Sequence, residues 1–281
     1  MGRTGSPAAG VRATLKTWAA NAGCAIDEKG YVRSLEANFF EPLSACTHAE
    51  FAMGDGAELG KNGAVGKIQA LHSSAALACN VFDYWRGRDT AALAQALGTP
   101  GRFCSIQFEA KFPTGLGGKA PNLDLLLGRT DGAHIAVESK FLEPYGGAKP
   151  RLFKEKYFPE GPGLWERVGL PQAERVARQL REKPDTFLYL DAQQLLKHLL
   201  GLAQREGTYS LLYLWYDVGG DAGSAHEEEV RAFLSALSGA RVPLSSRTYP
   251  SLYQGLSDAG GAAHRSYLDY LGRRYFSSVG A

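Results

Sequence analysis

The chain has 281 residues, of which 44% are hydrophobic and 21% charged, the composition of an ordinary globular protein that can bury a core without disulfides or a structural metal. Its net charge of +2 is too small to indicate a nucleic-acid partner by itself, so any basic surface must be local. The four cysteines form no Cys-x-x-Cys pair, no leader opens the chain and no apolar run reaches ~18 residues, so we expect a cytoplasmic protein without a membrane span.

Apolar periodicity predicts two helices before the first strand. Residues 1–10 are small and rich in glycine and proline, and we expect them to be frayed. Over 11–22 and 64–84, apolar residues recur at spacings of three and four, as on one face of a helix. In the second segment this stripe consists of Ile68, Leu71, Ala75, Ala78 and Phe82. Much of the chain between the two helices shows no regular pattern.

Three apolar segments with strand character follow. They cover residues 103–112, 123–127 and 134–141, and Pro113 with the glycines after it ends the first. The second and third are joined by Gly-Arg-Thr-Asp-Gly at 128–132, and Asp-Gly between two such runs is a strong hairpin signal. We therefore expect consecutive antiparallel strands.

The second half of the chain predicts a helical region with one further strand. After a loop over 143–162, helices are expected over 171–183, 192–205, 227–238 and 262–275. Pro171 suits a first helical turn, and Asp191 could cap the helix that follows it. The run at 209–217 is nearly all apolar, as in a strand covered on both faces. This order predicts a mixed α/β fold in which the late strand joins the sheet after a helical crossover.

Two acids and a lysine lie on the predicted hairpin. Asp124 and Glu138 stand on its two arms, and Lys140 follows Glu138 by two residues, so the last two project from the same strand face. Hydrolysing a phosphodiester requires an activated water, neutralised phosphate charge and a stabilised leaving oxygen, which a hard divalent cation bound by carboxylates can supply. An ammonium group there can hold the attacking water or screen developing charge. We therefore assign Asp124, Glu138 and Lys140 as candidate catalytic residues, with the two acids as metal ligands.

The hairpin loop sets a geometric condition on this site. Directly paired residues share a face, and Asp124 opposes Glu138 only if the strands pair around position 131, which requires an odd loop or a bulge. A strict two-residue loop at Asp131-Gly132 would instead pair Asp124 with Ser139 and separate the acids onto opposite faces. We predict the odd loop.

The segment Pro-Asn-Leu-Asp at 121–124, followed by Val-Glu-Ser-Lys at 137–140, resembles the motif of the PD-(D/E)XK nuclease superfamily, the restriction-endonuclease-like fold. The wider run, with His-Ser-Ser-Ala-Ala-Leu-Ala-Cys-Asn-Val-Phe at 72–82 and Glu-Ser-Lys-Phe-Leu-Glu-Pro-Tyr at 138–145, looks like that of bacterial proteins described as restriction endonucleases. Two residues separate Pro121 from the aspartate, a departure that leaves this proline without an assigned role.

This resemblance implies an α-β-β-β-α-β core, with a mixed sheet flanked by helices, in a domain at 56–281 that ends in a helical elaboration. Residues 1–55 would form a helical or irregular N-terminal extension. The implied function is a Mg²⁺-dependent endonuclease that hydrolyses DNA in restriction or DNA repair, with Mn²⁺ as a substitute for Mg²⁺. A further metal-side acid from the first helix is implied, and Glu58 lies just before the predicted helix at 64–84. Whether two copies pair as a homodimer to cut both strands stays open.

Other interpretations of the same residues are open. Acid-x-Lys triplets also occur at 27–29 and 109–111, and the second lies on a predicted strand, so Glu109 is the main rival as a further acid. Glu138 and Lys140 could form a solvated charge pair of little energetic consequence. Glu58 could equally be a charge favoured at a helix N-terminus.

Two broader features also allow more than one interpretation. Residues 140–183 carry ten Lys or Arg against six Glu, interleaved with aromatic residues; they could hold phosphates and stack bases, or form a solvated loop anchored by its aromatic side chains. The six histidines show no metal-ligand spacing. An alternative of another class is a catalytically inactive nuclease-like module that binds nucleic acid or a protein partner. A carboxylate-pair glycosidase is disfavoured because the lysine beside the acid would have no clear role.

Overall fold

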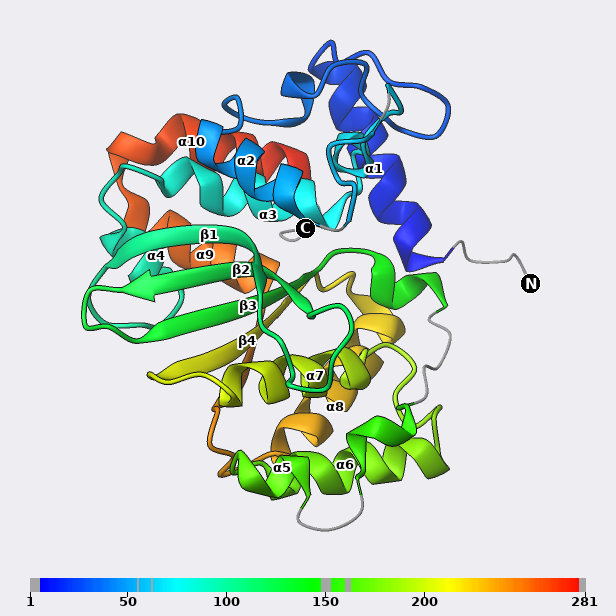
Figure 1. Ribbon diagram of the computed structural model, residues 1–281. Coiled ribbons are helices and arrows are strands. Elements are labelled where there is room, and N and C mark those ends of the chain that lie inside the picture. The colour runs from blue at the N-terminus through cyan, green and yellow to red at the C-terminus, as the bar shows by residue number, and fades with distance from the viewer. Residues whose placement is uncertain (1–5, 55, 62, 148–152, 160–162, 278–281) are drawn as a thin grey trace.

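A five-stranded mixed sheet forms the centre of the molecule and lies between two layers of helices (Figure 1). The computed structural model describes residues 6–54, 56–61, 63–147, 153–159 and 163–277. The strands lie side by side in chain order, as β1 (Phe103–Lys111), β2 (Asn122–Arg129), β3 (His134–Lys140), β4 (Tyr209–Trp215) and β5 (Leu244–Thr248). The first three pair antiparallel, whereas β3, β4 and β5 pair parallel because long helical connections separate them.

The helices divide between the two faces of the sheet (Figure 1). One layer contains α1 (Pro7–Asn21), α2 (Ala45–Met53), α3 (Ser74–Phe82), α4 (Ala91–Ala96), α9 (Tyr249–Gly260) and α10 (Arg265–Leu271). The other contains α5 (Leu164–Arg167), α6 (Pro171–Glu182), α7 (Ala192–Ala203) and α8 (Gly220–Ala236). Taken along the chain, α3, β1, β2, β3, α7 and β4 form the expected α-β-β-β-α-β core, so the predicted fold class is confirmed.

Alternate residues of the central strands pack into two buried clusters, one on each face of the sheet. On β3, Val137 belongs to the cluster under α3 and α9, and its neighbour Ala136 to the cluster under α7. Leu15 of α1 and Phe51 of α2 are buried in the same cluster as Val137. The first 55 residues therefore contribute side chains to one of the two main cores.

The loop between β2 and β3 has the odd length on which the site depends. Gly128 pairs with His134, so the two strands pair around position 131. The amide of Arg129 donates to the carbonyl oxygen of Ala133 at 2.8 Å, and Gly132 adopts a φ of 85°, a left-handed conformation that costs glycine little. The predicted register is confirmed.

The predicted helix at 64–84 is wrong in its first half. The helix α3 begins only after Ser73, whose side chain caps its first turn, and a single 3-10 turn, η2 (Lys67–Gln69), precedes it. Ile68 and Leu71 are buried as the periodicity indicated, but from an irregular segment. Burial periodicity alone therefore did not distinguish a helix from a chain held against the core.

The remaining elements agree with the predictions unevenly. The helices expected at 11–22, 171–183 and 192–205 correspond to α1, α6 and α7, and Asp191 caps α7 as predicted. The expectation that the chain is frayed up to residue 10 is wrong for residues 7–10, because Ser6 caps α1 and Pro7 begins it. The last predicted helix, at 262–275, divides into a 3-10 turn, α10 and a π-helical turn. The elements α2, α4, β5 and α9 were not predicted, and α8 begins seven residues earlier than expected, at Gly220.

A buried arginine joins the C-terminal end of the described chain to the N-terminal layer. Arg274 lies in the π-helical turn η7 (Gly272–Phe276) and is 0% exposed, yet no described carboxylate forms a salt bridge with it. Its guanidinium donates to the backbone carbonyl of Asn38 at 2.8 Å and to the side-chain oxygen of Asn38 at 2.5 Å. It also lies 4.4 Å from the ring centroid of Trp18 in α1. Hydrogen bonds and aromatic faces thus take the place of a counterion.

Substituting Gly201 in α7 with alanine is expected to lower the free energy of unfolding by about 1–3 kcal/mol, despite the better helix propensity of alanine. A Cβ at this position would lie 2.4 Å from the backbone oxygen of Phe112, so α7 would have to move away from the chain that leaves β1. Gly10 in α1 is the matched control, since no atom lies within 4 Å of its added Cβ. Gly10→Ala should instead stabilise by about 0.5–1 kcal/mol. Urea unfolding of both variants measures the difference, and stabilisation by Gly201→Ala would contradict the close approach.

Candidate functional site

Three acidic residues stand in one row across the first three strands. Continuing the β2–β3 register by one residue from Leu125 and Val137 places Asp124 opposite Glu138. In the β1–β2 register, Asp124 falls opposite Glu109, between the flanking pairs on either side. Directly opposed residues of neighbouring strands lie about 4.5–5.5 Å apart at Cβ when the pairing is regular. The fold therefore gathers Asp124, Glu138 and Glu109 at one edge of the sheet.

Glu138 is a buried carboxylate held by two nitrogen groups. Its side chain is 1% exposed, and its Oε1 lies 2.5 Å from Nζ of Lys140. Its Oε2 lies 2.9 Å from Nε2 of His198, on α7. Burial alone would raise the pKa of Glu138, but Lys140 and His198 together lower it to about 2. The same contact with Glu138, and the nearby charge of Asp124, hold the pKa of Lys140 above its usual value although burial opposes this.

Asp124 has the opposite electrostatic behaviour. It is partly buried, and one carboxylate oxygen accepts a hydrogen bond from the backbone amide of Ser139 at 2.7 Å. Burial, followed by the negative charge of Glu138, raises its pKa well above the usual range, and Glu109 acts in the same direction. Two neighbouring acids with pKa values shifted in opposite directions are typical of sites that divide their chemical roles. The charge of Lys140 and the amide of Ser139 lower the pKa of Asp124 but do not outweigh burial and the neighbouring acids.

Glu109, the rival acid of the sequence analysis, lies beside the predicted residues. Its φ is 53°, which is uncommon for a residue other than glycine, and it sits where β1 crosses opposite Asp124. Nδ2 of Asn122 donates to its Oε2 at 2.9 Å. A Cβ added to Gly54 would lie 2.9 Å from the same oxygen, so the carboxylate lies close against the end of α2. The 109–111 triplet thus supplies an acid to the same site rather than forming a separate one.

Glu58, the fourth predicted residue, lies at the margin of this site. It forms a salt bridge of 3.7 Å with Lys67, and burial raises its pKa. The charged groups that act most strongly on it are Lys67, Glu109 and Glu143. The structure brings Glu58 near the rival acid Glu109 and records no direct contact of Glu58 with Asp124 or Glu138 among the described side chains.

The donor set suits a hard cation only in part. In the described ranges, no group of three or more His, Cys, Asp or Glu side chains is arranged to hold a metal ion. The ammonium of Lys140 lies 2.5 Å from one oxygen of Glu138, an oxygen that a cation would also need. Asp124 and Glu138 nevertheless supply the oxygen ligands that Mg²⁺ prefers, and a cation would offset the charge that raises the pKa of Asp124.

His198 and Tyr249 are contacts of the motif strand that sequence reasoning missed. The histidines were set aside for lack of metal spacing, whereas His198 contacts Glu138 from the crossover helix. The hydroxyl of Tyr249, at the start of α9, lies 2.6 Å from that of Ser139, on the opposite face of β3. The helix that connects two parallel strands packs on the sheet, so a histidine on the apolar face of that helix could have been expected to contact a strand residue.

A second histidine fixes the chain that follows the motif. His226 of α8 is 0% exposed, and its ring nitrogens lie 3.1 Å from the hydroxyl of Tyr145 and 3.0 Å from that of Tyr213. Tyr145 belongs to the turn η4 (Glu143–Gly146), and Tyr213 pairs with Glu138 across β3 and β4. Burial lowers the pKa of His226 to about 4.

This burial predicts a specific acid instability. As pH falls from 6.5 towards 4, the imidazole protonates in the unfolded chain before it does so in the folded protein, so the stabilisation present above pH 6.5 is progressively lost. At about 1.4 kcal/mol for each pKa unit, this residue should account for about 3 kcal/mol. Urea unfolding at pH 6.5 and near pH 4 should show a smaller loss for His226→Gln than for the wild type. The exposed His48 is the control, and an equal effect of His48→Gln would contradict the assignment.

The basic segment at 140–183 contributes less to a nucleic-acid surface than its composition allows. The aromatic side chains Phe153, Tyr157 and Trp165 are buried in the core under α7, so they cannot stack on bases. Arg178 and Arg181 pair with glutamates on the same surface. Two of the counted basic residues, at 149 and 151, lie outside the described residues. Among the described aromatic residues, anchoring of a solvated loop is the interpretation that the structure favours.

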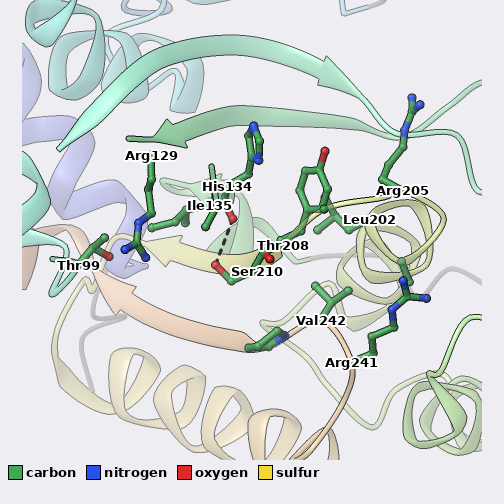
Figure 2. A pocket seen from close by; sticks show the side chains of 15 residues that line it. Thr99, Arg129, His134, Ile135, Leu202, Arg205, Thr208, Ser210, Arg241 and Val242 are labelled. Carbon is green, nitrogen blue, oxygen red and sulfur yellow. Dashed lines mark hydrogen bonds between the residues drawn. The ribbon is translucent and has the colours of Figure 1, made fainter. Parts of the chain in front are cut away.

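The largest cavity among those described does not coincide with the acids. Its volume is about 410 Å³, and it is formed by the β2–β3 turn, the starts of β3 and β4 and the chain before β5 (Figure 2). Figure 2 shows Arg129 and His134 along this cavity, with Ser210 donating to the carbonyl of His134. These residues lie at the loop end of the hairpin, whereas Asp124 and Glu138 lie at its open end. None of the predicted site residues lines it.

Comparisons with known proteins give one match over nearly the whole chain. A family model described as restriction endonuclease associating with ARP matches residues 12–276. No curated protein and no solved structure matches the chain. Within the described ranges, none of the helices has the length and apolar character needed to cross a membrane.

Proposed function

The chain belongs to the family of restriction endonucleases associating with ARP, and from this premise we propose that it is a Mg²⁺-dependent endonuclease that hydrolyses DNA at Asp124, Glu138 and Lys140. The observation that carries the proposal is the position of these residues at the open end of the β2–β3 hairpin. There, a buried glutamate, a lysine and a second acid with a raised pKa occupy neighbouring strands. Sites of perturbed acidity are frequently catalytic.

Hydrolysis of a DNA phosphodiester forms one P–O bond from a water molecule and breaks another in the backbone. The water loses a proton, the leaving oxygen gains one, and negative charge builds on the non-bridging oxygens in between. A divalent cation, when bound, supplies the neutralisation of that charge. Asp124 and Glu138 are the residues that would hold it, together with Glu109 or Glu58 as a further acid, and Mn²⁺ would substitute for Mg²⁺.

Lys140 is the residue assigned to the water and the phosphate. Its Nζ is positively charged over the working pH range, because Glu138 and Asp124 raise its pKa. It can donate hydrogen bonds to the attacking water and to a non-bridging phosphate oxygen at the same time. His198 is a positioning residue in this scheme, since it contacts the other oxygen of Glu138 and limits rotation of the carboxylate.

A plasmid assay tests this proposal. We expect purified protein to convert supercoiled plasmid to nicked or linear DNA with Mg²⁺, and to lose this activity with EDTA. Asp124→Asn removes a metal-binding charge at nearly constant shape and should abolish Mg²⁺-dependent cleavage. Equal cleavage by the wild type with Mg²⁺, the wild type with EDTA and the variant would exclude the proposal.

A second candidate function is a nuclease-like module that binds nucleic acid or a protein partner without cutting. The observation that favours it is the ion pair between Lys140 and Glu138, which occupies a metal-ligand oxygen with an ammonium group. Isothermal titration with Mg²⁺ and Mn²⁺ separates the two functions. Absence of binding at millimolar metal would support the inactive module, and binding that Asp124→Asn removes would support the nuclease.

A further inference from the structure

A cavity with three basic side chains lies beside α1. Its volume is about 390 Å³, and its lining includes Arg12, Lys16, Lys29 and His72. We call these four residues the α1 basic pocket. They come from α1, from the turn at residues 29–31 and from the segment just before α3, so the fold assembles the charge from separate parts of the sequence.

The three cations of this pocket, Arg12, Lys16 and Lys29, form no salt bridge with any described carboxylate. The Nζ of Lys16 donates to the backbone oxygen of Glu28 at 3.1 Å, a neutral partner. All three cations are exposed, while His72 is half-buried. Burial, and then the charge of Arg12, lower the pKa of His72, whereas the charge of Glu143 raises it.

Glu143 lies between the α1 basic pocket and the row of acids formed by Asp124, Glu138 and Glu109, which we call the catalytic edge. This residue begins the turn η4, against which α1 packs, three residues after Lys140 (Figure 1). Its carboxylate accepts a hydrogen bond from the amide of Phe141 at 2.8 Å. Its charge acts on His72 from one side and on Lys140 from the other. The turn η4 therefore adjoins both α1, which carries Arg12 and Lys16, and the end of the strand that carries Lys140.

The catalytic edge alone is poorly suited to a polyanion. The charges of Asp124, Glu138 and Glu143 all act on Lys140, and the charge of Glu109 acts on Asp124, so DNA phosphates away from the reacting group would be repelled by these acids. Cations just outside the acidic row can offset this repulsion, because phosphate contacts by Lys and Arg supply most of the sequence-independent affinity for DNA. The α1 basic pocket has both the charge and the location for this role.

We propose that the α1 basic pocket binds a backbone phosphate of the DNA strand next to the bond that is cut. This inference rests on the proposed function for the identity of its ligand, and it adds a subsite outside the motif residues. Arg12 offers a planar set of donors that matches two phosphate oxygens, whereas Lys16 and Lys29 act as point charges on either side. Such a subsite sets affinity and register without reading sequence.

The test measures DNA binding rather than cleavage. Fluorescence anisotropy of a labelled duplex is recorded in EDTA over a series of salt concentrations, with the full chain and with Arg12→Gln/Lys16→Gln. We expect weaker binding of every duplex sequence, and a salt dependence of log affinity whose slope is smaller by about one for each phosphate that the variant no longer neutralises. The matched control is Arg205→Gln/Arg241→Gln, two exposed arginines beside the cavity at the other end of the sheet. This control should leave the slope unchanged.

The outcomes separate this inference from the proposed function. A reduced slope in the α1 variant but not in the control supports the pocket even if the wild type never cuts DNA. A slope unchanged from the wild type overturns the pocket even if the wild type cuts DNA with Mg²⁺. The other possible ligand of the same chemistry is free inorganic phosphate, whose binding is measured separately for the wild type and the α1 variant. If the variant loses phosphate binding but binds DNA like the wild type, the pocket is a site for a free anion and the inference is overturned.

Discussion

Replacing Lys140 with methionine is expected to lower the rate of Mg²⁺-dependent DNA cleavage by about 10²–10³-fold, the usual effect of removing one donor that stabilises charge in the transition state. Methionine keeps the length and apolar stem of lysine but cannot donate to the water or the phosphate. The rate is measured from single-turnover plasmid cleavage, so that slow product release does not hide the chemical step.

Lys111→Met is the matched control for this variant. Lys111 ends the other strand-borne acid-x-Lys triplet, and its Nζ donates to the backbone oxygen of Met53 at 3.2 Å, away from Glu138. Its loss should leave the cleavage rate nearly unchanged. An equal fall in both variants would assign the effect to general charge, and no fall at Lys140 would remove its catalytic role.

Lys140→Met is also expected to destabilise the protein. Glu138 is 1% exposed, and removing its ammonium partner leaves a buried carboxylate with only His198 beside it. Breaking a buried ion pair on one side costs about 3–5 kcal/mol, whereas replacing both partners by uncharged groups is often close to neutral. The double variant Glu138→Gln/Lys140→Met should therefore unfold near the wild-type urea concentration and still lack cleavage activity.

Substituting Arg274 with methionine is expected to lower the free energy of unfolding by about 2–4 kcal/mol. The change leaves the side-chain oxygen of Asn38 without its donor inside the core, at a cost of about 1–3 kcal/mol. It also removes a cation from the face of Trp18, worth about 2 kcal/mol when desolvated. Relief of the buried charge offsets part of this loss.

The adjacent residue provides the comparison for Arg274. Arg273 is exposed, and among the described residues it donates to the backbone oxygen of Asp269, at 3.3 Å. Its replacement by methionine should change the stability by no more than about 0.5 kcal/mol. Urea unfolding of both variants gives the contrast directly, and similar midpoints would show that the guanidinium of Arg274 contributes nothing beyond its apolar stem.

The sequence was sufficient to predict the hairpin and its register. Most residues of β2 and β3 are apolar, and Asp131-Gly132 indicates a tight turn between them. Requiring Asp124 and Glu138 on one face then selected the odd loop, and the register agrees. The local pattern located the hairpin, but it was also compatible with a two-residue loop, so the chemical condition was needed to select the register that the structure shows.

The errors arose where tertiary contacts override local pattern. The strand β5 has the sequence Leu-Ser-Ser-Arg-Thr and was not predicted, because it lacks an apolar run. It lies at the edge of the sheet and pairs with one neighbouring strand, so it does not need the apolar run of a central strand. Glu109 occupies its place through a left-handed φ that no propensity indicates for glutamate. His198 reaches Glu138 from 60 residues away, across a crossover that sequence spacing does not describe.

The motif strand is attached to both helical layers at successive residues. Glu138 contacts His198 on α7, and Ser139 contacts Tyr249 at the start of α9, on the other side of the sheet. Loosening of either layer would therefore displace the strand that carries Glu138 and Lys140. On heating, cleavage activity and near-ultraviolet circular dichroism should consequently disappear in a single cooperative transition, with no temperature interval in which the protein stays folded but inactive.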